Sequence, residues 1–591
     1  NYESPYSEMM WESPDGTKIF GILFANWYNN GNEVPTDKKI AKEYWDDRLK
    51  KVATFASTDE YLLMNGCDHQ PVQADLGKAI EVASELYPDI NFKHSNFPEY
   101  IKAIKEKVPN DLAVVKGELT SQDTDGWSTL MNCASSHIYL KQMNRKCELA
   151  LENGAEPVRV LSSVLGQNYP SDELEYSWKK LMQNHPHDSI CCCSVDEVQD
   201  EMATRFNKSK QVADYLVSEG KRYIADKINT KEYEKYKNAL PFVVFNTAGR
   251  ERTSVVSVEI DVTRKSGWLT KCAYDLDEIN VPNYKLIDSD GNSIPFKIED
   301  LGVKFGYDLP KDKFRQPYMA RRVRVTFEAE NISAVGYKTY ALVEGDTEKV
   351  TDTLVSSENC MENDAIRVEI NKNGSLNVTD KASGRTYKGV AYYEETGDLG
   401  NEYMYKMPEG SKAITTQDTV AKIELAEDEP YRAMYKITNT ITVPKSGDDN
   451  FEDEKSHMVF FKERVGGRSN DTVEMKIETF VSLDKNGKGV KIKTRFDNEV
   501  KDHRVRIMVP TGINSDVHKA DSVFEVVTRN NRHNAGWNNP SACEHEQGFV
   551  SIDDGEKGIA VANIGLYEYE MLPDLDNTIA VKILRAVGEM G

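Results

Sequence analysis

The sequence predicts a multidomain α+β protein in three successive parts: the last part of an α/β domain, a helical bundle and a large antiparallel β-sandwich region. Helix-like and strand-like spacing alternate in residues 1–92, the apolar period becomes 3.6 residues in 93–235, and strand-length runs separated by turns fill 236–591. With 591 residues, 39% of them hydrophobic, the chain can bury a separate core in each part. We expect domains at these three ranges, with the last one incomplete at its C-terminal end.

The first part, residues 1–92, alternates strand and helix patterns. Lys18–Ala25 (KIFGILFA) and Glu60–Met64 (EYLLM) are apolar runs of strand length and predict buried strands. Between them, Asp37–Ala56 has the spacing of a helix with one apolar face. Such an alternation is typical of an α/β domain.

The second part, residues 93–235, has the pattern of long helices joined by short connections. Asn96, or the serine before it, is expected to cap a first helix, and a second is expected over about 128–152, where the pair Asn153-Gly154 ends it. Ser194 and Glu197 form a capping box before the last helix, whose apolar face continues to about residue 228. These features predict a helical bundle.

The third part, residues 236–591, reads as strands throughout. Gly, Asn and Asp turns separate the runs, and no stretch of helical period interrupts them. A large antiparallel β-sandwich region is therefore expected. The predicted strands are Phe242–Phe245, Thr253–Val262, Arg321–Phe327, Ile366–Ile370, Tyr435–Val443, Val473–Val481, Val490–Phe496, Val505–Val509 and Gly558–Ile564.

Composition excludes several classes of protein. A net charge of -23 without a basic stripe makes nucleic acid an unsuitable partner, and no run reaches the roughly 18 apolar residues that a membrane span needs. The nine cysteines include three in a row at 191–193, which does not fit a secreted disulfide framework. We therefore expect a cytoplasmic protein whose thiols are small buried hydrophobic groups, and both chain ends are expected to be cuts through folded material.

Asp68 is the first candidate for chemistry. It lies in the stretch Asn65–Pro71 (NGCDHQP), directly after a predicted buried strand, where α/β folds place reactive groups. A carboxyl there can act as a general acid if its surroundings raise its pKa. The alternative is a turn-forming Asp that caps a following helix over Val72–Leu86.

The stretch Asn184–Ser189 (NHPHDS) is the second candidate. His187 offers an imidazole for a metal, and Asp188 offers a carboxylate for the metal's surroundings or for a substrate hydroxyl. The alternative is a polar loop between two helices, and for His185 by itself this alternative is the better interpretation.

Aromatic and amide side chains form the third candidate. Trp27–Asn32 (WYNNGN) combines rings that can stack on sugars with amides that can bind hydroxyls, and Asn32 is the member that we assign to substrate binding. Tyr403, in Gly400–Tyr405 (GNEYMY), presents the same choice between a carbohydrate cleft and a surface turn.

Five stretches in order along the chain resemble the glycoside hydrolase family 38 α-mannosidases, most of all their bacterial members. They are LLMNGCDHQP at 62–71, NHPHDSICCCSVDEV at 184–198, VVFNTAGRERT at 243–253, DHRVRIMVPTG at 502–512 and GLYEYEML at 565–572. Each alone is weak, but together they span all three parts of the chain. The resemblance implies a seven-stranded, barrel-like α/β domain, then a helical bundle and a β-sandwich region.

The resemblance also implies site roles. Asp68 corresponds to the acid/base, His187 to a ligand of a zinc ion (Zn2+), and Asp188 and Tyr403 to residues that contact the sugar. The implied activity is retaining, exo-acting hydrolysis of terminal α-linked mannose in mannosides or mannose-containing oligosaccharides, by a cytoplasmic enzyme that can be a homodimer. Linkage preference is left open.

One departure from the family pattern qualifies these roles. The family's HxD zinc-binding motif and the D-x-F-G-type stretch with the nucleophilic Asp are both missing from these 591 residues. The nucleophile is therefore expected to be absent from this chain, which by itself should be inactive and hold zinc poorly. Two alternatives remain: a non-catalytic carbohydrate-binding relative, and a metal-dependent hydrolase of another class, such as a phosphoesterase.

Overall fold

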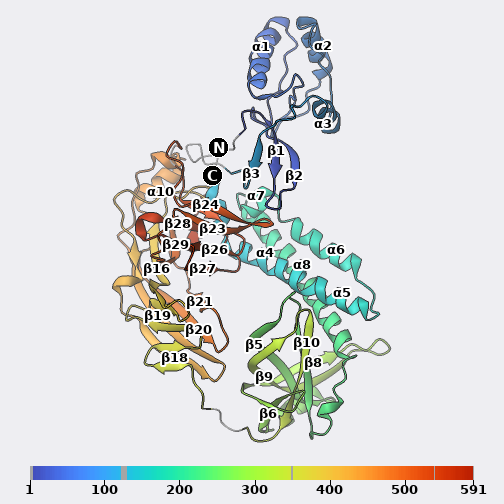
Figure 1. Cartoon of the computed structure of the whole chain (residues 1–591), viewed down its shortest axis with the longest axis vertical. Coiled ribbons are helices and arrows are strands. Elements are labelled where there is room, and N and C mark those ends of the chain that lie inside the picture. The colour runs from blue at the N-terminus through green and yellow to red at the C-terminus, as the bar shows by residue number, and fades with distance from the viewer. Residues whose placement is uncertain (1–3, 121–129, 348–350, 538–539, 590–591) are drawn as a thin grey trace. The chain divides into compact units, whose positions relative to one another are not determined.

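The computed structural model describes residues 4–120, 130–347, 351–537 and 540–589. The chain divides into two compact units, an N-terminal unit of residues 1–123 and a C-terminal unit of residues 124–591 (Figure 1). Helices and mostly antiparallel sheets together make the mixed α+β, multidomain fold that the sequence predicts. Among the residues that the structure describes, none of the helices has the length and apolar composition of a membrane span.

In its described residues, 4–120, the N-terminal unit combines a small sheet with three helices. Strand β1 (Glu8–Glu12) pairs antiparallel with β2 (Lys18–Ile22) and parallel with β3 (Val114–Lys116). Helices α1 (Lys38–Phe55) and α2 (Leu76–Leu86) pack on each other through small and aromatic side chains, including Ala41, Trp45, Ala79 and Ala83. Helix α3 (Phe97–Lys105) is capped by Asn96, whose Oδ1 accepts the backbone N–H of Glu99 at 3.0 Å, as predicted.

Two strand predictions in this unit are wrong in part. The strand from Lys18 ends at Ile22, and its residues are exposed or half-buried. The segment Glu60–Met64 is half-buried and forms no strand, because its backbone groups bind a side chain in place of a neighbouring strand. Asn30 supplies that side chain, donating to the carbonyl of Leu62 at 3.1 Å and accepting the N–H of Met64 at 2.7 Å.

Helices occupy the first part of the C-terminal unit. After a 3₁₀ turn, η1 (Met131–Ser135), they are α4 (Ile138–Ala150), a π-helical turn η2 (Leu151–Ala155), α5 (Glu156–Val164), α6 (Ser171–Met182), α7 (His187–Ile190) and α8 (Asp196–Ala225). Their shared core includes Leu140, Leu151, Leu181, Phe206 and Leu216.

Two predictions about these helices are wrong. The pair Asn153-Gly154 does not end a helix, because it lies in η2 and the chain continues directly into α5. Gly154 is there for packing: a Cβ at this position would lie 3.0 Å from Cγ2 of Val217 on α8. Nor is there a capping box, since α8 begins at Asp196 and Val195 precedes it without a side-chain cap.

The next region is a two-sheet sandwich. One sheet has the order β4-β10-β6-β7 and the other β5-β9-β8, and residues of both sheets share one core around Phe327 and Leu342. The strands are β4 (Leu240–Asn246), β5 (Arg252–Lys265), β6 (Tyr284–Asp288), β7 (Ser293–Ile294), β8 (Phe296–Asp308), β9 (Gln316–Ile332) and β10 (Gly336–Glu344). Helix α9 (Leu269–Asp277) interrupts them, contrary to the prediction of strands throughout, and buries Cys272 and Leu276.

The remaining strands of the described ranges form four antiparallel sheets. Their orders are β11-β12-β13-β14-β15, β17-β16-β22-β29-β28-β25, β18-β19-β20-β21 and β24-β23-β26-β27. The bounds are β11 (Val355–Ser357), β12 (Cys360–Glu362), β13 (Ile366–Ile370), β14 (Leu376–Asp380), β15 (Arg385–Val390), β16 (Tyr392–Gly397), β17 (Ile414–Thr415), β18 (Lys422–Glu429), β19 (Arg432–Pro444), β20 (Thr472–Asp484), β21 (Lys491–Arg495), β22 (His503–Val509), β23 (Val517–Ser522), β24 (Glu525–Asn530), β25 (Cys543–His545), β26 (Phe549–Asp553), β27 (Gly558–Ala562), β28 (Glu568–Leu572) and β29 (Thr578–Ala586), with helix α10 (Asp449–Ser456) between β19 and β20.

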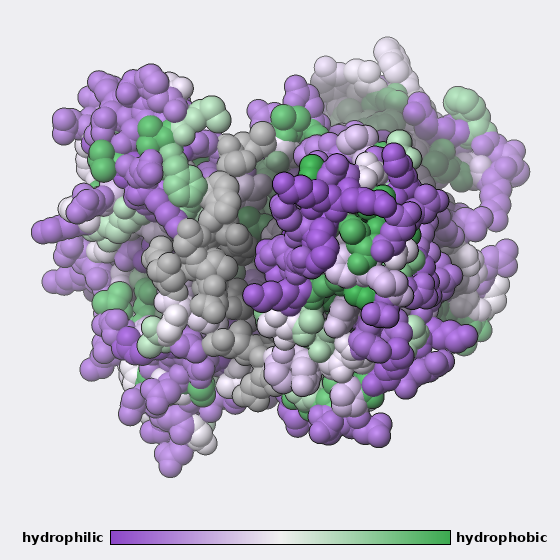
Figure 2. All heavy atoms as spheres, turned by 90° about the horizontal axis from the view of Figure 1, so that it is seen from above, coloured by the Kyte–Doolittle hydropathy of each residue, from purple (hydrophilic) through white to green (hydrophobic). Residues whose placement is uncertain are grey.

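Hydrophilic residues cover most of the face seen in Figure 2, and hydrophobic side chains show there as small separate patches. This surface agrees with the net charge of -23. The six-stranded sheet that contains β16, β22, β28 and β29 differs from it, because charged side chains of these strands are buried. That sheet positions part of the candidate site.

Candidate functional site

Asp68 lies on an exposed turn of the N-terminal unit and is held by one aromatic side chain. The hydroxyl of Tyr28 donates to Oδ2 of Asp68 at 2.8 Å. Tyr28 also stacks on Trp27, with ring centroids 5.3 Å apart and an interplanar angle of 26°. The structure therefore brings together two stretches that the sequence offered separately, the NGCDHQP stretch and the aromatic, amide-rich stretch.

Further hydrogen bonds hold these two stretches side by side. Besides the bonds of Asn30, the N–H of Gly31 donates to the carbonyl of Met64 at 2.9 Å, and Nδ2 of Asn65 donates to the carbonyl of Gly31 at 3.0 Å. A Cβ at position 31 would lie 2.9 Å from the Cβ of Leu63, so the close approach requires glycine. The predicted substrate-binding residue Asn32 is half-buried in the same turn, and its carbonyl accepts the Tyr44 hydroxyl.

The backbone beside Asp68 is strained. Trp27 has a φ of 70° and His69 a φ of 60°, in the left-handed region that residues other than glycine rarely adopt. Such conformations persist only where the surroundings hold them, and they concentrate at functional sites. The alternative interpretation of Asp68 as a helix cap is wrong, because α2 begins at Leu76 and follows Asp75.

His187 and Asp188 open the short helix α7 in the C-terminal unit, directly after Pro186. Nε2 of His187 lies 3.1 Å from Oδ1 of Asp188, and both side chains are open to solvent, at 83% and 74% exposure. His185 is different: its Nε2 bonds to Oδ1 of Asn144 at 2.8 Å, and burial lowers its pKa. This contact agrees with the structural interpretation of His185.

Cys193 connects this pair to the third predicted residue of the unit. Its Sγ lies 3.7 Å from Oδ1 of Asp188, and its thiol is hydrogen-bonded to the hydroxyl of Tyr403. Burial raises the pKa of both Tyr403 and Cys193. The C-terminal unit therefore assembles His187, Asp188 and Tyr403 in one cluster, with Cys193 between the last two.

The cysteine run differs from its prediction. Cys192 is buried, but Cys191 and Cys193 are half-buried and lie among polar groups. The Cys133 thiol and the nearby ammonium of Lys141 lower the pKa of the Cys191 thiol. Cys191 and Cys193 therefore have polar surroundings, which an interpretation as small buried hydrophobic groups misses, and Cys193 contacts the site residue Asp188.

The predicted zinc ligand does not have a full set of partners among the described residues. A zinc site needs three or four protein ligands, drawn mainly from Cys, His and carboxylates. Across the described ranges, no group of three or more His, Cys, Asp or Glu side chains is arranged to hold a metal ion. His187 with Asp188 supplies one ligand and a neighbouring carboxylate, which is not a complete site.

Family models match the chain along nearly its whole length. The model of the glycosyl hydrolases family 38 N-terminal domain matches residues 2–128, and that of the α-mannosidase middle domain matches 128–224. Two further models, described as family 38 C-terminal domain 1 and C-terminal domain, match 237–344 and 361–589. The chain belongs to glycoside hydrolase family 38. The resemblance found in the sequence motifs is confirmed.

Relatives of this family 38 chain include proteins from two bacteria. A putative mannosylglycerate hydrolase of Halalkalibacterium halodurans is 42% identical over 600 residues, covering 100% of this chain and 66% of the relative. A crystal structure of an α-mannosidase from Enterococcus faecalis has a TM-score of 0.96 and 44% identity, over 100% of this chain and 66% of that one. A second family 38 structure from Enterococcus faecalis has a TM-score of 0.89 and 40% identity, over 99% and 66%. The chain thus spans about two thirds of the length of these relatives.

Tyr28 and Cys193 are the functional candidates that sequence reasoning missed. Tyr28 stood in a stretch already chosen for its composition, but nothing in the sequence placed it against Asp68, 40 positions away. Cys193 stood five residues after Asp188, a spacing that carries no ligand pattern. Both contacts depend on turns whose path no residue pattern fixes.

Proposed function

We propose that this chain is part of a retaining, exo-acting α-mannosidase that hydrolyses terminal α-linked mannose. The observation that carries the proposal is Asp68, an exposed carboxylate held by the Tyr28 hydroxyl on a strained turn, in a chain of family 38. The names of the relatives, an α-mannosidase and a putative mannosylglycerate hydrolase, support mannosides as the substrate class and extend it to small mannosyl solutes.

In this proposal Asp68 works as the acid and then as the base. Its proton goes to the glycosidic oxygen as the leaving group departs, and the resulting carboxylate takes a proton from the water that releases mannose. Tyr28 orients the carboxyl through Oδ2, which leaves Oδ1 to face the leaving group. Retention requires a second carboxylate roughly 5 to 5.5 Å away as the nucleophile. That this nucleophile is absent from the chain remains a prediction.

The cluster in the C-terminal unit supplies sugar contacts. Asp188 accepts and Tyr403 donates or accepts hydrogen bonds, which suits neighbouring hydroxyls of a hexose. Asn32 offers an amide to a hydroxyl from its turn in the N-terminal unit. His187 has the role of a single zinc ligand: Asp188 contacts its Nε2, an arrangement that orients an imidazole for binding through its other nitrogen. Zinc would polarise sugar hydroxyls as a Lewis acid, with its other ligands outside the described residues.

The test replaces Asp68 in the protein of full natural length. Asp68→Asn keeps the shape and the Tyr28 contact but removes the transferable proton, so kcat/KM on an unactivated mannobiose should fall roughly 10²- to 10⁴-fold. Nitrophenyl α-mannoside needs less protonation of its leaving group and should be affected much less. Asp75→Asn, at an exposed Asp of the same unit, is the control and should leave kcat/KM on both substrates unchanged.

If Asp68→Asn lowered kcat/KM equally on both substrates, Asp68 would not be the acid/base. Binding of methyl α-mannoside without any hydrolysis, in the unchanged protein, would favour the alternative of a non-catalytic carbohydrate-binding relative.

A phosphoesterase needs a cluster of metal-binding carboxylates, and the described residues contain no such group. The free state of all nine cysteines, which lie in the described ranges, supports the proposal of a reducing, cytoplasmic location; a homodimer stays a prediction.

A further inference from the structure

Tyr403 lies on a turn that forms no regular structure and must be held by other groups. The turn runs from Asp398 to Lys406, after strand β16. Within it, Oδ1 of Asn401 accepts the N–H groups of Tyr403 and Met404, both at 3.0 Å. These local bonds shape the turn, but they do not fix it to the rest of the C-terminal unit.

Asn132 fixes the turn on one side. Its N–H donates to the carbonyl of Tyr403 at 3.2 Å, and its Oδ1 accepts the N–H of Tyr405 at 2.7 Å. Asn132 is 1% exposed and belongs to η1, far from the turn in sequence. One buried residue therefore binds the peptide groups on both sides of position 404.

Arg585 fixes the turn on the other side. Its guanidinium donates to the carbonyls of Asn401, Glu402 and Met404 at 2.5, 3.1 and 2.9 Å, and to Oδ2 of Asp398 at 2.7 Å. The side chain is fully buried. A planar group with five donors matches such a set of acceptors and leaves the turn little freedom.

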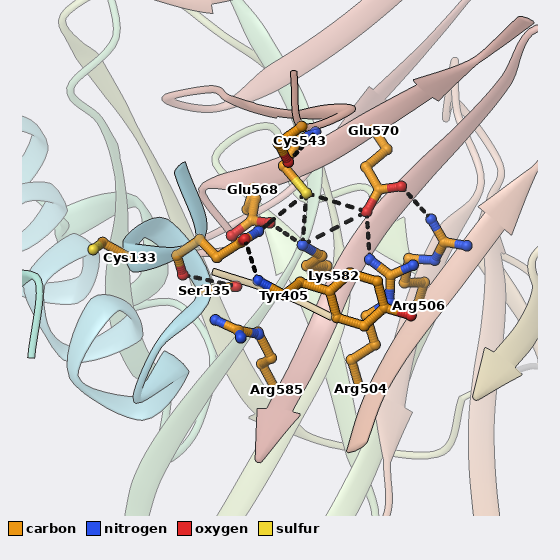
Figure 3. Close-up of polar contacts among 12 residues, drawn as sticks. Cys133, Ser135, Tyr405, Arg504, Arg506, Cys543, Glu568, Glu570, Lys582 and Arg585 are labelled. Carbon is orange, nitrogen blue, oxygen red and sulfur yellow. Dashed lines mark hydrogen bonds and ion pairs between the residues drawn. The ribbon is translucent and has the colours of Figure 1, made fainter. Parts of the chain in front are cut away.

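Asn132 is itself held by a buried network of charged residues. Figure 3 shows the members Glu568, Lys582 and Glu570 of this network around Cys543. Its Nδ2 donates to Oε1 of Glu568 at 2.8 Å and contacts Sγ of Cys543 at 3.1 Å. Lys582 completes the group: its ammonium forms an ion pair with Glu568 and lies 2.9 Å from Sγ of Cys543. Because both partners of Asn132 are fixed by Lys582, the amide has one orientation available.

The network continues to the ring next to Tyr403. Arg504 lies over the ring of Tyr405, 3.4 Å from its centroid, and bonds to Glu570. Glu570 also accepts from Arg506 at 2.6 Å and lies 3.6 Å from Lys582. The motifs DHRVRIMVPTG and GLYEYEML supply the arginines and the glutamates.

We propose that Asn132 is a positioning residue, which transmits the rigidity of the Glu568–Lys582–Cys543 group to the turn and thereby fixes the Tyr403 hydroxyl for sugar binding. The inference rests on the proposed role of Tyr403 in binding the substrate. It adds a function to the buried network, which would otherwise only fasten η1 to the six-stranded sheet.

The experiment exchanges the amide of Asn132 and the carboxylate of Glu568 between the two positions. Asn132→Asp places a second carboxylate against Glu568, whereas Asn132→Asp combined with Glu568→Gln restores a donor and an acceptor with their positions reversed. Tyr403 is replaced by 3-fluorotyrosine, and its ¹⁹F resonance is recorded for each chain. We expect one narrow line for the unchanged protein, broadening or several lines for Asn132→Asp, and a return to one line in the double variant.

Kinetics on nitrophenyl α-mannoside provide the second readout. A misplaced Tyr403 loses a ground-state contact, so KM should rise roughly three- to tenfold in Asn132→Asp, the range for one hydrogen bond, with a smaller change in kcat. Asn363→Ala is the matched control. Asn363 is another buried amide that is bound to the backbone of a turn, in its case through four backbone groups, and its loss should leave both the resonance and KM unchanged.

An unchanged ¹⁹F line in Asn132→Asp, or the same disturbance in Asn363→Ala, would overturn the proposal. Asn132→Ser, which brings no new charge, replaces Asn132→Asp if that chain does not fold. If the unchanged protein neither binds nor hydrolyses mannosides, the proposed function fails, and the ¹⁹F spectra still decide whether Asn132 positions Tyr403.

Discussion

Two groups of charged residues in the C-terminal unit have similar pair distances and opposite surroundings. In the six-stranded sheet, Glu570 bonds to Arg504 and Arg506 at 2.6 Å, with all three side chains at most 7% exposed. At the start of α7, His187 and Asp188 are 3.1 Å apart and 83% and 74% exposed. The buried charges are directed at one another, whereas the exposed pair keeps acceptor and donor positions open to a ligand.

This difference separates residues that stabilise the fold from residues that can bind a ligand. Charges removed from water must find partners within the protein, and removing one partner costs several kcal/mol because the other stays buried. Exposed pairs contribute little, since water competes with the partner. We expect substitutions in the sheet to change the free energy of unfolding and substitutions at α7 to change ligand binding.

Glu570→Gln should have the largest effect. Burial raises the pKa of Glu570, but Arg504, Arg506 and Lys582 outweigh burial and hold that pKa well below its usual range. The variant leaves buried cations without their counter-charge, so the free energy of unfolding should fall by about 3 to 5 kcal/mol. Urea denaturation at pH 7 measures this loss. The control is Asp214→Asn, in the exposed Lys210–Asp214 pair, which should lower the free energy of unfolding by less than about 0.5 kcal/mol.

The lowered pKa of Glu570 determines how its contribution to stability changes with pH. The stabilisation from Glu570 is present above the unfolded-state value of 4.5 and is lost as pH falls toward the folded-state pKa. The difference between the unchanged protein and Glu570→Gln should therefore shrink in acid. A loss below about 1 kcal/mol at pH 7 would contradict the view of the network as a set of mutually required charges.

Glu546→Gln tests the opposite case, a buried carboxyl with too few partners. Glu546 is 1% exposed; Asn563 donates to its Oε1, while its Oε2 lacks a hydrogen-bond partner within the described part of the chain. Burial raises the pKa of Glu546 from 4.5 to about 8. The folded state favours the neutral form of Glu546. The contribution of this carboxyl to the free energy of unfolding is therefore fully present below pH 4.5 and is lost as pH rises through 8.

The glutamine variant has no proton to lose. It should be more stable than the unchanged protein by about 2 to 4 kcal/mol at pH 9, and this gain should fade toward pH 5. Thermal and urea unfolding across this pH range provide the measurement. A difference that is the same at both ends would show that Glu546 does not titrate in the folded state.

His187→Ala should have the smallest effect on stability. An exposed side chain of this kind changes the free energy of unfolding by no more than about 0.5 kcal/mol, while zinc content in the protein of full natural length should fall. His185→Ala is the control, because it removes the hydrogen bond between His185 and Asn144 and should cost about 1 kcal/mol without changing zinc. Emission spectrometry after dialysis counts the zinc, and equal zinc in all three proteins would exclude His187 as a ligand.

Sequence patterns predicted features that depend on neighbours in the chain. The Asn96 cap and the change from helices to strands follow from local spacing and polarity. Patterns failed where distant segments decide. Glu60–Met64 has strand composition but binds Asn30, and Gly154 resembles a helix end but serves contact with α8.

The candidate site shows the same division. Asp68 and His187 could be proposed from motifs, but Tyr28, Cys193 and Asn132 reach their partners through turns. One signal was available for the network: Arg504 and Arg506, like Glu568 and Glu570, are two residues apart on strands and so share a face. Opposite charges on one face of the same sheet, here on β22 and β28 with β29 between them, predict buried pairs, which alternation of hydrophobic residues alone does not.

The π-helical turn Leu151–Ala155 joins α4 to α5. It holds one residue more than an α-helical turn, and each residue of an α-helix turns the following side chains by about 100°. The wider π turn absorbs this extra residue, so deleting a single residue there would restore one continuous α-helix and leave α5 with nearly the same face, that of Val158, toward the core. The chain can therefore gain or lose one residue at this point while α5 keeps its contact with α8, whereas the same change inside α5 itself would turn its buried face toward solvent.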